Sequence, residues 1–120
     1  MAVSNPLQRL AEIEARFRVP PHNVEAEQAL LGAILVNNDA FYRVSDFLGP
    51  EHFSEELHRR IYDIIKSLIL AGKLATPITL KTFVGEQDIG GMTVAQYLAR
   101  LAAEATSVIN AEAYGRTIYD

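Results

Sequence analysis

Two adjacent prolines near the start of the chain fix where its first core helix can form. Pro20 and Pro21 lack N–H donors and push the residue before each of them out of the α region, so no helix runs through them. Asn23 then offers a side-chain oxygen to the free N–H groups of a new helix. The pattern predicts a short segment before the prolines and a core helix over residues 24–36.

The predicted helix carries one apolar face. Its large aliphatic residues recur at spacings of one, three and four: Leu30, Leu31, Ile34 and Leu35. Glu25 and Glu27 lie in the first turns, where the helix dipole favours negative charge. Residues that lie two positions apart on a helix point in different directions. The pair Glu25 and Glu27 is therefore interpreted as helix-end charge and not as a general acid and base.

Five further helices are predicted in order. Asp39 can cap a short helix through Leu48, and Phe53 is expected to fill the core. Ser54 opens the longest predicted helix, which ends at Gly72 as its C′ residue and is expected to be the main packing partner of the first. Three more helices are predicted over residues 78–86, 93–105 and 108–120.

Local signals define the last two of these helices. Thr93 and Gln96 have the spacing of a capping box at the start of one helix, and residues 88–91 are expected to form a loop before it. Thr106 and Ser107 make the turn and cap for the last helix. That helix reaches Asp120 without a stop signal, which indicates a fragment of a longer protein.

Residues 1–18 are predicted to form an arm outside the core. The arm has a narrow apolar stripe at helical spacing, made by Leu7, Leu10, Ile13 and Phe17. A helix this short has only marginal stability in isolation. A marginal helix and a disordered tail therefore remain alternative predictions for this arm. The predicted organisation is an arm over 1–18, a globular helical domain over 19–105 and a last helix over 106–120. The fold class is all-α, a compact bundle of about six or seven short helices.

Composition narrows the functional classes. A chain of 120 residues is one domain by size, and its net charge of −4 argues against strong nucleic-acid binding. The basic doublet Arg59–Arg60 is interpreted as a solvated helix face. The absence of cysteine excludes disulfides and thiolate zinc sites, and no apolar run approaches the length of a membrane span. A soluble, cytoplasmic protein is expected.

No catalytic or cofactor motif is complete. Gly85 and Gly90 have the separation of a phosphate-binding loop, but Gly91 and Met92 stand where Lys and Ser or Thr are required. The three histidines lack metal-ligand spacing, and His58 is interpreted as solvated or helix-terminal. Ser54 and Ser107 have no suitable partners and are interpreted as helix caps. No catalytic, cofactor-binding or metal-binding residue is therefore assigned. The remaining candidates for a functional role are surface residues that could contact another protein.

Several segments in order resemble a known family. Residues 19–32 closely resemble the opening of the N-terminal domain of bacterial replicative DNA helicases of the DnaB type. The segments 58–62, 78–80, 90–101 and 110–114 resemble later motifs of the same domain: His-Arg-Arg-Ile-Tyr, Ile-Thr-Leu, Gly-Gly followed by Tyr-Leu, and the Asn-x-x-x-Tyr start of the last helix here. The stretch 76–78 departs from the family, which usually has an acidic residue before this Ile-Thr-Leu. Tyr97 also lies further from the glycines than is usual.

The resemblance implies a function for the parent protein and for this part of it. The parent would be a hexameric 5′–3′ helicase that unwinds DNA at the replication fork with ATP and Mg, using a C-terminal RecA-like domain absent here. The present domain would be a non-catalytic collar that ends in the start of a helical hairpin, joins in pairs and docks the helicase-binding domain of primase. A helicase loader is a further partner to consider, and DNA would be bound weakly or through the parent.

The resemblance also directs attention to four residues. Glu25 and Tyr97 are candidates for a primase-facing surface, and Tyr114 and Ile118 for the hairpin contact between copies. Two alternatives stay open. One is a small helical nucleic-acid-binding domain that uses Arg59, Arg60 and Lys66; the other is a free-standing adaptor.

Overall fold

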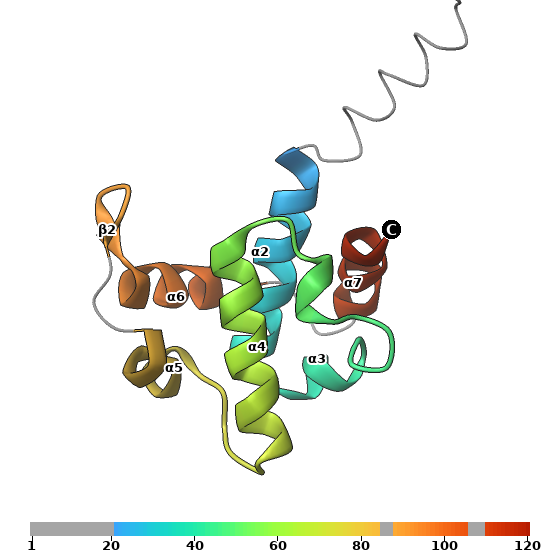
Figure 1. The fold of residues 1–120 in the computed structure, drawn as a ribbon, viewed down its shortest axis with the longest axis horizontal. Coiled ribbons are helices and arrows are strands. Elements are labelled where there is room, and N and C mark those ends of the chain that lie inside the picture. Colours follow the sequence, from blue (N-terminus) through green and yellow to red (C-terminus); the bar gives the residue numbers. More distant parts are fainter. Residues whose placement is uncertain (1–20, 85–87, 106–109) are drawn as a thin grey trace, which may run out of the picture.

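A computed structural model of the chain describes residues 21–84, 88–105 and 110–120, and the predicted arm over 1–18 lies outside them. Within the described part, six α-helices and a two-stranded hairpin surround one apolar core (Figure 1). In chain order they are α2 (Pro21–Val36), α3 (Asp39–Tyr42), α4 (Glu56–Leu70), α5 (Pro77–Val84), β1 (Asp88–Ile89), β2 (Met92–Thr93), α6 (Val94–Ala103) and α7 (Ala111–Tyr119). The 3₁₀ turn η1 (Pro50–His52) precedes α4. The all-α prediction is confirmed.

Helix α2 lies at the centre of the fold. It begins at Pro21, because proline suits a first helical position that needs no N–H donor, and Asn23 therefore lies inside the helix and not at its N-cap as predicted. Its predicted apolar residues are all buried. Helices α6 and α7 pack against α2 more extensively than α4 does, so the expectation that α4 is its main partner was wrong.

A close approach explains the contact between α2 and α6. A Cβ atom on Gly32 would collide with the backbone carbonyl oxygen of Leu101 and would lie 3.5 Å from the Cβ of Ala105. Because Gly32 carries no side chain, the two helices meet at their backbones. The small residue thus lets the end of α6 cross directly over the middle of α2.

Helix α3 is shorter than predicted, because hydrogen-bonded turns replace the helix after Tyr42. Asp39 is its first residue, and Asn38 occupies the N-cap position without a side-chain capping bond. The Asn38 amide instead exchanges two hydrogen bonds with the backbone of Ala75, at 2.8 and 2.9 Å. The end of α2 is thereby tied to the segment that follows α4.

Helix α4 has the predicted C-terminus but a later start. Gly72 has a φ of 75°, and the N–H groups of Gly72 and Lys73 donate to the carbonyl oxygens of Ile69 and Leu68, which is a Schellman motif. The helix begins at Glu56 and is one residue shorter than α2, so it is not the longest helix. Phe53, just before it, is buried as predicted.

The loop expected over residues 88–91 is a small antiparallel hairpin. Asp88 pairs with Thr93, and Ile89 pairs with Met92. Gly90 and Gly91 form the two-residue turn with φ values of 61° and 96°, a conformation that glycine adopts at little cost. At its end the Thr93–Gln96 capping box is present, with bonds of 2.9 and 3.1 Å, as predicted. The hairpin therefore leads directly into α6.

Candidate protein-interaction site

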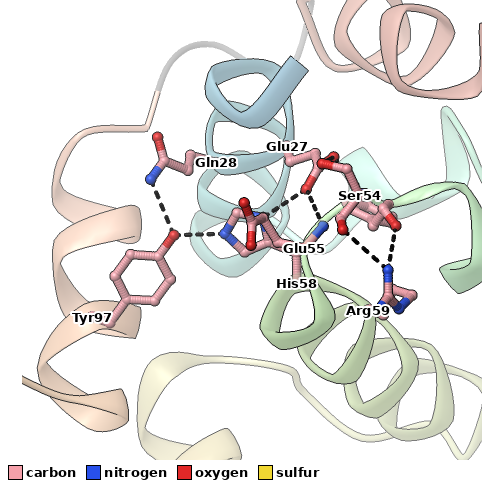
Figure 2. Close-up of polar contacts among 8 residues, drawn as sticks. Glu27, Gln28, Ser54, Glu55, His58, Arg59 and Tyr97 are labelled. Carbon is pink, nitrogen blue, oxygen red and sulfur yellow. Dashed lines mark hydrogen bonds and ion pairs between the residues drawn. The ribbon is translucent and has the colours of Figure 1, made fainter. Parts of the chain in front are cut away.

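The most buried charge in the described chain is the carboxylate of Glu27. Its side chain is 1% exposed, and it faces the start of α4 (Figure 2). The N–H and Oγ–H of Ser54 donate to Oε2 at 2.8 and 2.7 Å. The Nδ1 of His58 lies 2.7 Å from Oε1. Glu27 therefore joins α2 to the entry of α4 through several charge-assisted hydrogen bonds.

His58 extends this network to α6. Because an ionised carboxylate only accepts hydrogen bonds, the proton facing Glu27 lies on Nδ1, and the other ring nitrogen, Nε2, is hydrogen-bonded to the Tyr97 hydroxyl at 2.6 Å. The side-chain amide of Gln28 donates to the same hydroxyl oxygen at 3.1 Å. In Figure 2, Tyr97 and Glu27 lie on opposite sides of the imidazole. Three helices are thus connected through one buried histidine.

The network determines the protonation of its acidic members. Burial alone raises the pKa of the Glu27 carboxyl, but the hydrogen bonds from His58 and Ser54 outweigh that effect, and the pKa lies below its ordinary value of 4.5. Burial raises the pKa of Tyr97, and the Gln28 hydrogen bond opposes this only in part. At neutral pH the network therefore holds an ionised Glu27 and a protonated Tyr97.

These contacts correct three interpretations from the sequence. His58 is 2% exposed and hydrogen-bonded at both nitrogens, so it is not a solvated histidine. Glu27 is a buried acceptor and not a helix-end surface charge. Ser54 gives its hydrogen bonds to Glu27, and the N-cap position of α4 belongs to Glu55, which makes no side-chain cap bond. The physical reason is the same in each case, because all three side chains face another helix.

Arg59 also has an internal role. Its Nη1 donates to the carbonyl oxygens of Phe53 at 2.9 Å and Ser54 at 3.2 Å, and its side chain is half-buried. The guanidinium thereby binds the turn that precedes its own helix. It is not the fully solvated side chain that the sequence predicted.

The opposite face of α2 is open and forms a trough between α6 and α7. On the α6 side is a hollow of about 440 Å³ that reaches the hairpin; its walls include Glu25, Gln28, Ala29, Met92, Tyr97 and Arg100. On the α7 side is a hollow of about 430 Å³ lined by Glu25, Ala26, Ala29, Tyr114 and Thr117. Because Glu25 and Ala29 line both hollows, we treat them as one surface, the α2 trough.

The trough brings together three of the four residues singled out from the sequence. Glu25 is exposed on its floor, Tyr97 forms part of the α6 wall, and Tyr114 forms part of the α7 wall. Ile118 does not belong to it, because its side chain is 6% exposed and packs into the core of the domain. Whether any of these residues contacts another protein stays a prediction.

Sequence reasoning missed the buried polar pair, although a signal was present. Glu27 precedes Leu30, Leu31 and Ile34 by three, four and seven positions, which places it on the apolar face of α2. His58 precedes Ile61, Tyr62 and Ile65 at the same spacings in α4. A charged or titratable residue on an apolar helical face indicates a buried partner on another element. The spacing does not identify that partner.

No group of three or more His, Asp or Glu side chains within residues 21–84, 88–105 and 110–120 is placed to hold a metal ion. None of the helices in the part of the chain that the structure describes has the combination of length and apolar character needed to cross a bilayer.

The fold and the trough define a class of protein, namely a small helical domain with polar groups engaged in internal bonds and an open surface rich in tyrosine. Aromatic and methionine side chains with a few charges are typical of protein-binding surfaces. The family model of the DnaB-like helicase N-terminal domain matches residues 19–120. The chain belongs to this family, which confirms the resemblance.

Individual relatives agree with the family assignment. The replicative DNA helicase DnaB of Rickettsia felis is 48% identical over 125 aligned residues that include 98% of this chain and 25% of the relative. The protein of the same name from Rickettsia typhi is 47% identical over 107 residues, which include 86% of this chain and 21% of the relative. The chain therefore spans about a quarter of the length of these relatives.

A solved structure shows the same fold. The N-terminal domain of DnaB helicase from Mycobacterium tuberculosis superposes with a TM-score of 0.69 at 31% sequence identity. The match covers 80% of this chain and 70% of that domain. The helical arrangement around α2 is therefore that of a DnaB N-terminal domain.

Proposed function

We propose that this chain is the N-terminal collar domain of a hexameric replicative DNA helicase, that it stabilises the ring by self-association and that it docks primase. The unwinding reaction, with its ATP and Mg, would belong to a motor domain outside residues 1–120. The relatives named replicative DNA helicase are about four times as long as this chain, which supports such a division of labour. The work would take place in the cytoplasm.

One observation carries the docking role. Residues from three helices and the hairpin converge on the α2 trough, and the trough has the chemistry of a protein-binding surface. Tyr97 presents its ring to the trough while its hydroxyl is held by His58 and Gln28. A side chain fixed in this way loses little conformational entropy when a partner binds. The trough is thus preorganised to receive an apolar surface from another protein.

A titration of primase tests the docking role. The Glu25→Arg variant should bind the helicase-binding domain of primase about tenfold more weakly, ~1.4 kcal/mol, because the reversed charge lies on the trough floor. Asp63→Arg is the matched control, since Asp63 is an exposed acidic residue of α4 outside the trough. Equal affinity of the Glu25→Arg variant and the unaltered chain, measured by calorimetry, would remove the docking assignment.

Sedimentation tests the assembly role. In a longer chain that includes both arms of the predicted hairpin, Tyr114→Ala and Ile118→Ala together should shift dimer toward monomer. Because Ile118 is buried, its substitution also weakens the core, so Tyr114→Ala alone is the sharper variant. An unchanged sedimentation mass of a Tyr114→Ala protein that remains folded would argue against this contact. A helicase loader can be tested for binding to the same proteins.

The nucleic-acid-binding alternative receives less support. Arg59, one of its three candidate residues, donates to two backbone carbonyl oxygens within the domain. The net charge of −4 further opposes phosphate binding. A flat anisotropy titration with single-stranded DNA at low salt is the expected result.

A further inference from the structure

The chain is acidic overall, but one stretch of it is basic. Residues 64–84 contain three of the chain's 11 basic residues and none of its 15 acidic residues. The three are Lys66, Lys73 and Lys81, and all of them are exposed. None of these lysines forms an ion pair with another described residue. The stretch is therefore a local positive region on a chain whose net charge is −4.

Large apolar side chains are exposed in the same stretch. Of the seven large apolar side chains that are exposed in the described part of the chain, three are Leu70, Leu74 and Ile78, which are 66%, 69% and 82% exposed. Single exposed apolar residues are common on soluble proteins, whereas a group of them at one place indicates a contact with another molecule. Together with the lysines they form a surface that we call the α4–α5 corner: Lys66, Leu70, Lys73, Leu74, Ile78 and Lys81.

The α4–α5 corner follows the turn where α4 passes into α5, at the lower end of α4 in Figure 1. Lys66 and Leu70 are four residues apart and therefore lie on one side of α4. The hydroxyl of Thr79 donates to the carbonyl oxygen of Leu74 at 3.0 Å, which holds the first turn of α5, with Ile78, close to the turn. Helices α4 and α5 also pack against each other. Residues from two helices and their connection thus meet at one corner of the fold.

The backbone of the connection is held in place from both sides. The N–H and the carbonyl oxygen of Ala75, which is buried, bond to the side-chain amide of Asn38 at 2.9 and 2.8 Å. The N–H of Thr76 donates to Oγ1 of Thr79 at 2.8 Å. Leu74 is therefore exposed on an anchored segment. Because such a segment is already ordered, less conformational entropy is lost when a partner covers it.

We propose that the α4–α5 corner binds a short acidic segment of another protein, in which Asp or Glu residues alternate with large apolar side chains. The carboxylates of this segment would face the three lysines, and its apolar side chains would cover Leu70, Leu74 and Ile78. The residues that line the α2 trough are not among those of the corner. The inference is therefore independent of the proposed docking of primase.

Other occupants fit the corner less well. A symmetric contact with a second copy would place lysines against lysines, and like charges oppose association. A nucleic acid would find three lysines but no arginine for bidentate phosphate contacts, and aliphatic side chains where stacking requires aromatic ones. Binding to a membrane surface typically uses the apolar face of one long amphipathic helix, whereas the apolar residues of the corner come from three separate segments.

An NMR titration of the isotope-labelled 120-residue chain tests the proposal. The probe is a peptide of about twelve residues that alternates Asp or Glu with Leu or Phe. It should shift the backbone amide signals of residues 66–82 in a saturable way and leave those of α7 unchanged. One control peptide has Ser in place of Leu and Phe, and a second has Lys in place of Asp and Glu. Each control should bind at least about fivefold more weakly than the probe.

Two single substitutions test the charged and the apolar part of the corner separately. Lys73→Glu and Leu74→Ser should each weaken binding of the probe about fivefold, and only Lys73→Glu should reduce its dependence on salt. Arg116→Glu is the matched control, because Arg116 is an exposed basic residue of α7, and its affinity should stay within about twofold of the unaltered chain. The comparison of peptides on the unaltered chain remains decisive if a variant does not fold.

Several results would overturn the proposal. Without saturable shifts, or with shifts confined to the α2 trough, the corner would not be the binding site of the probe. Equal affinity for the acidic peptide that contains Ser would reduce the effect to non-specific attraction between charges. Shifts of residues 66–82 that depend on the concentration of the chain alone would assign the corner to a second copy. Shifts with vesicles of anionic lipid but not with the probe would assign it to a membrane surface.

Discussion

Glu25 and Glu27 lie two residues apart on α2 and have contrasting environments. Glu27 faces α4, is buried, and accepts hydrogen bonds from Ser54 and His58. Glu25 faces the trough between α6 and α7, where it is exposed. The same side chain on the same helix therefore holds the fold together on one face and remains available to a partner on the other. The elements packed against each face decide which role results.

The largest expected effect comes from removing the buried carboxylate. Glu27→Ala should lower the free energy of unfolding by about 3–5 kcal/mol, because the ring N–H of His58 is left buried without its acceptor and the two hydrogen bonds from Ser54 are lost. Urea unfolding followed by circular dichroism measures the change. A loss no greater than that of a surface substitution would contradict the structural role of the network.

Acidification should remove part of the same stabilisation. The pKa of Glu27 is lower in the folded chain than its ordinary value of 4.5, so the unfolded state binds this proton more readily. The contribution is complete above about 4.5 and is lost as the pH falls toward the lower folded pKa. The stability difference between the unaltered chain and Glu27→Gln should therefore shrink between pH 7 and pH 3. A difference that stays constant or grows would oppose this interpretation.

A smaller effect is expected where α6 meets α2. Gly32→Ala introduces a Cβ against the backbone of Leu101, so the helices must separate at a cost of about 1–3 kcal/mol. Ala99→Ser, on the exposed side of α6, is the control and should change stability by less than ~0.5 kcal/mol. Thermal unfolding of the two variants provides the comparison. Equal midpoints would show that the close contact contributes nothing.

The smallest expected effect separates the two uses of Tyr97. Tyr97→Phe removes the hydroxyl that bonds His58 and Gln28 but keeps the ring in the wall of the trough. Stability should fall by about 1 kcal/mol. Tyr119→Phe, at a residue that is 47% exposed, should leave it unchanged. The same urea titration measures both variants, and identical curves would exclude an energetic role for the hydroxyl.

Features determined by neighbouring residues could be predicted from the sequence. The end of α4 at Gly72 and the Thr93–Gln96 capping box depend on residues within one helical turn, and both are present. The apolar face of α2 is equally local in origin. These signals were sufficient for the fold class, and the ordered motifs were sufficient for the family.

Features determined by distant residues could not be predicted in the same way. The partners of Glu27 and Tyr97 at His58 are 31 and 39 positions away, and no local pattern specifies such pairings. The hairpin was missed because strands of two residues show no periodicity. The candidate site was predicted only in part: Glu25, Tyr97 and Tyr114 share the trough, whereas Ile118 lies in the core.

The two faces of α2 are compared most directly by one pair of isosteric variants, Glu25→Gln and Glu27→Gln, in parallel urea titrations at pH 7. Both remove one charge and preserve the shape of the side chain. We predict that Glu27→Gln lowers the free energy of unfolding by at least about 2 kcal/mol, while Glu25→Gln changes it by less than ~0.5 kcal/mol. Equal losses in the two variants would contradict the division of α2 into a face that holds the fold together and an open face.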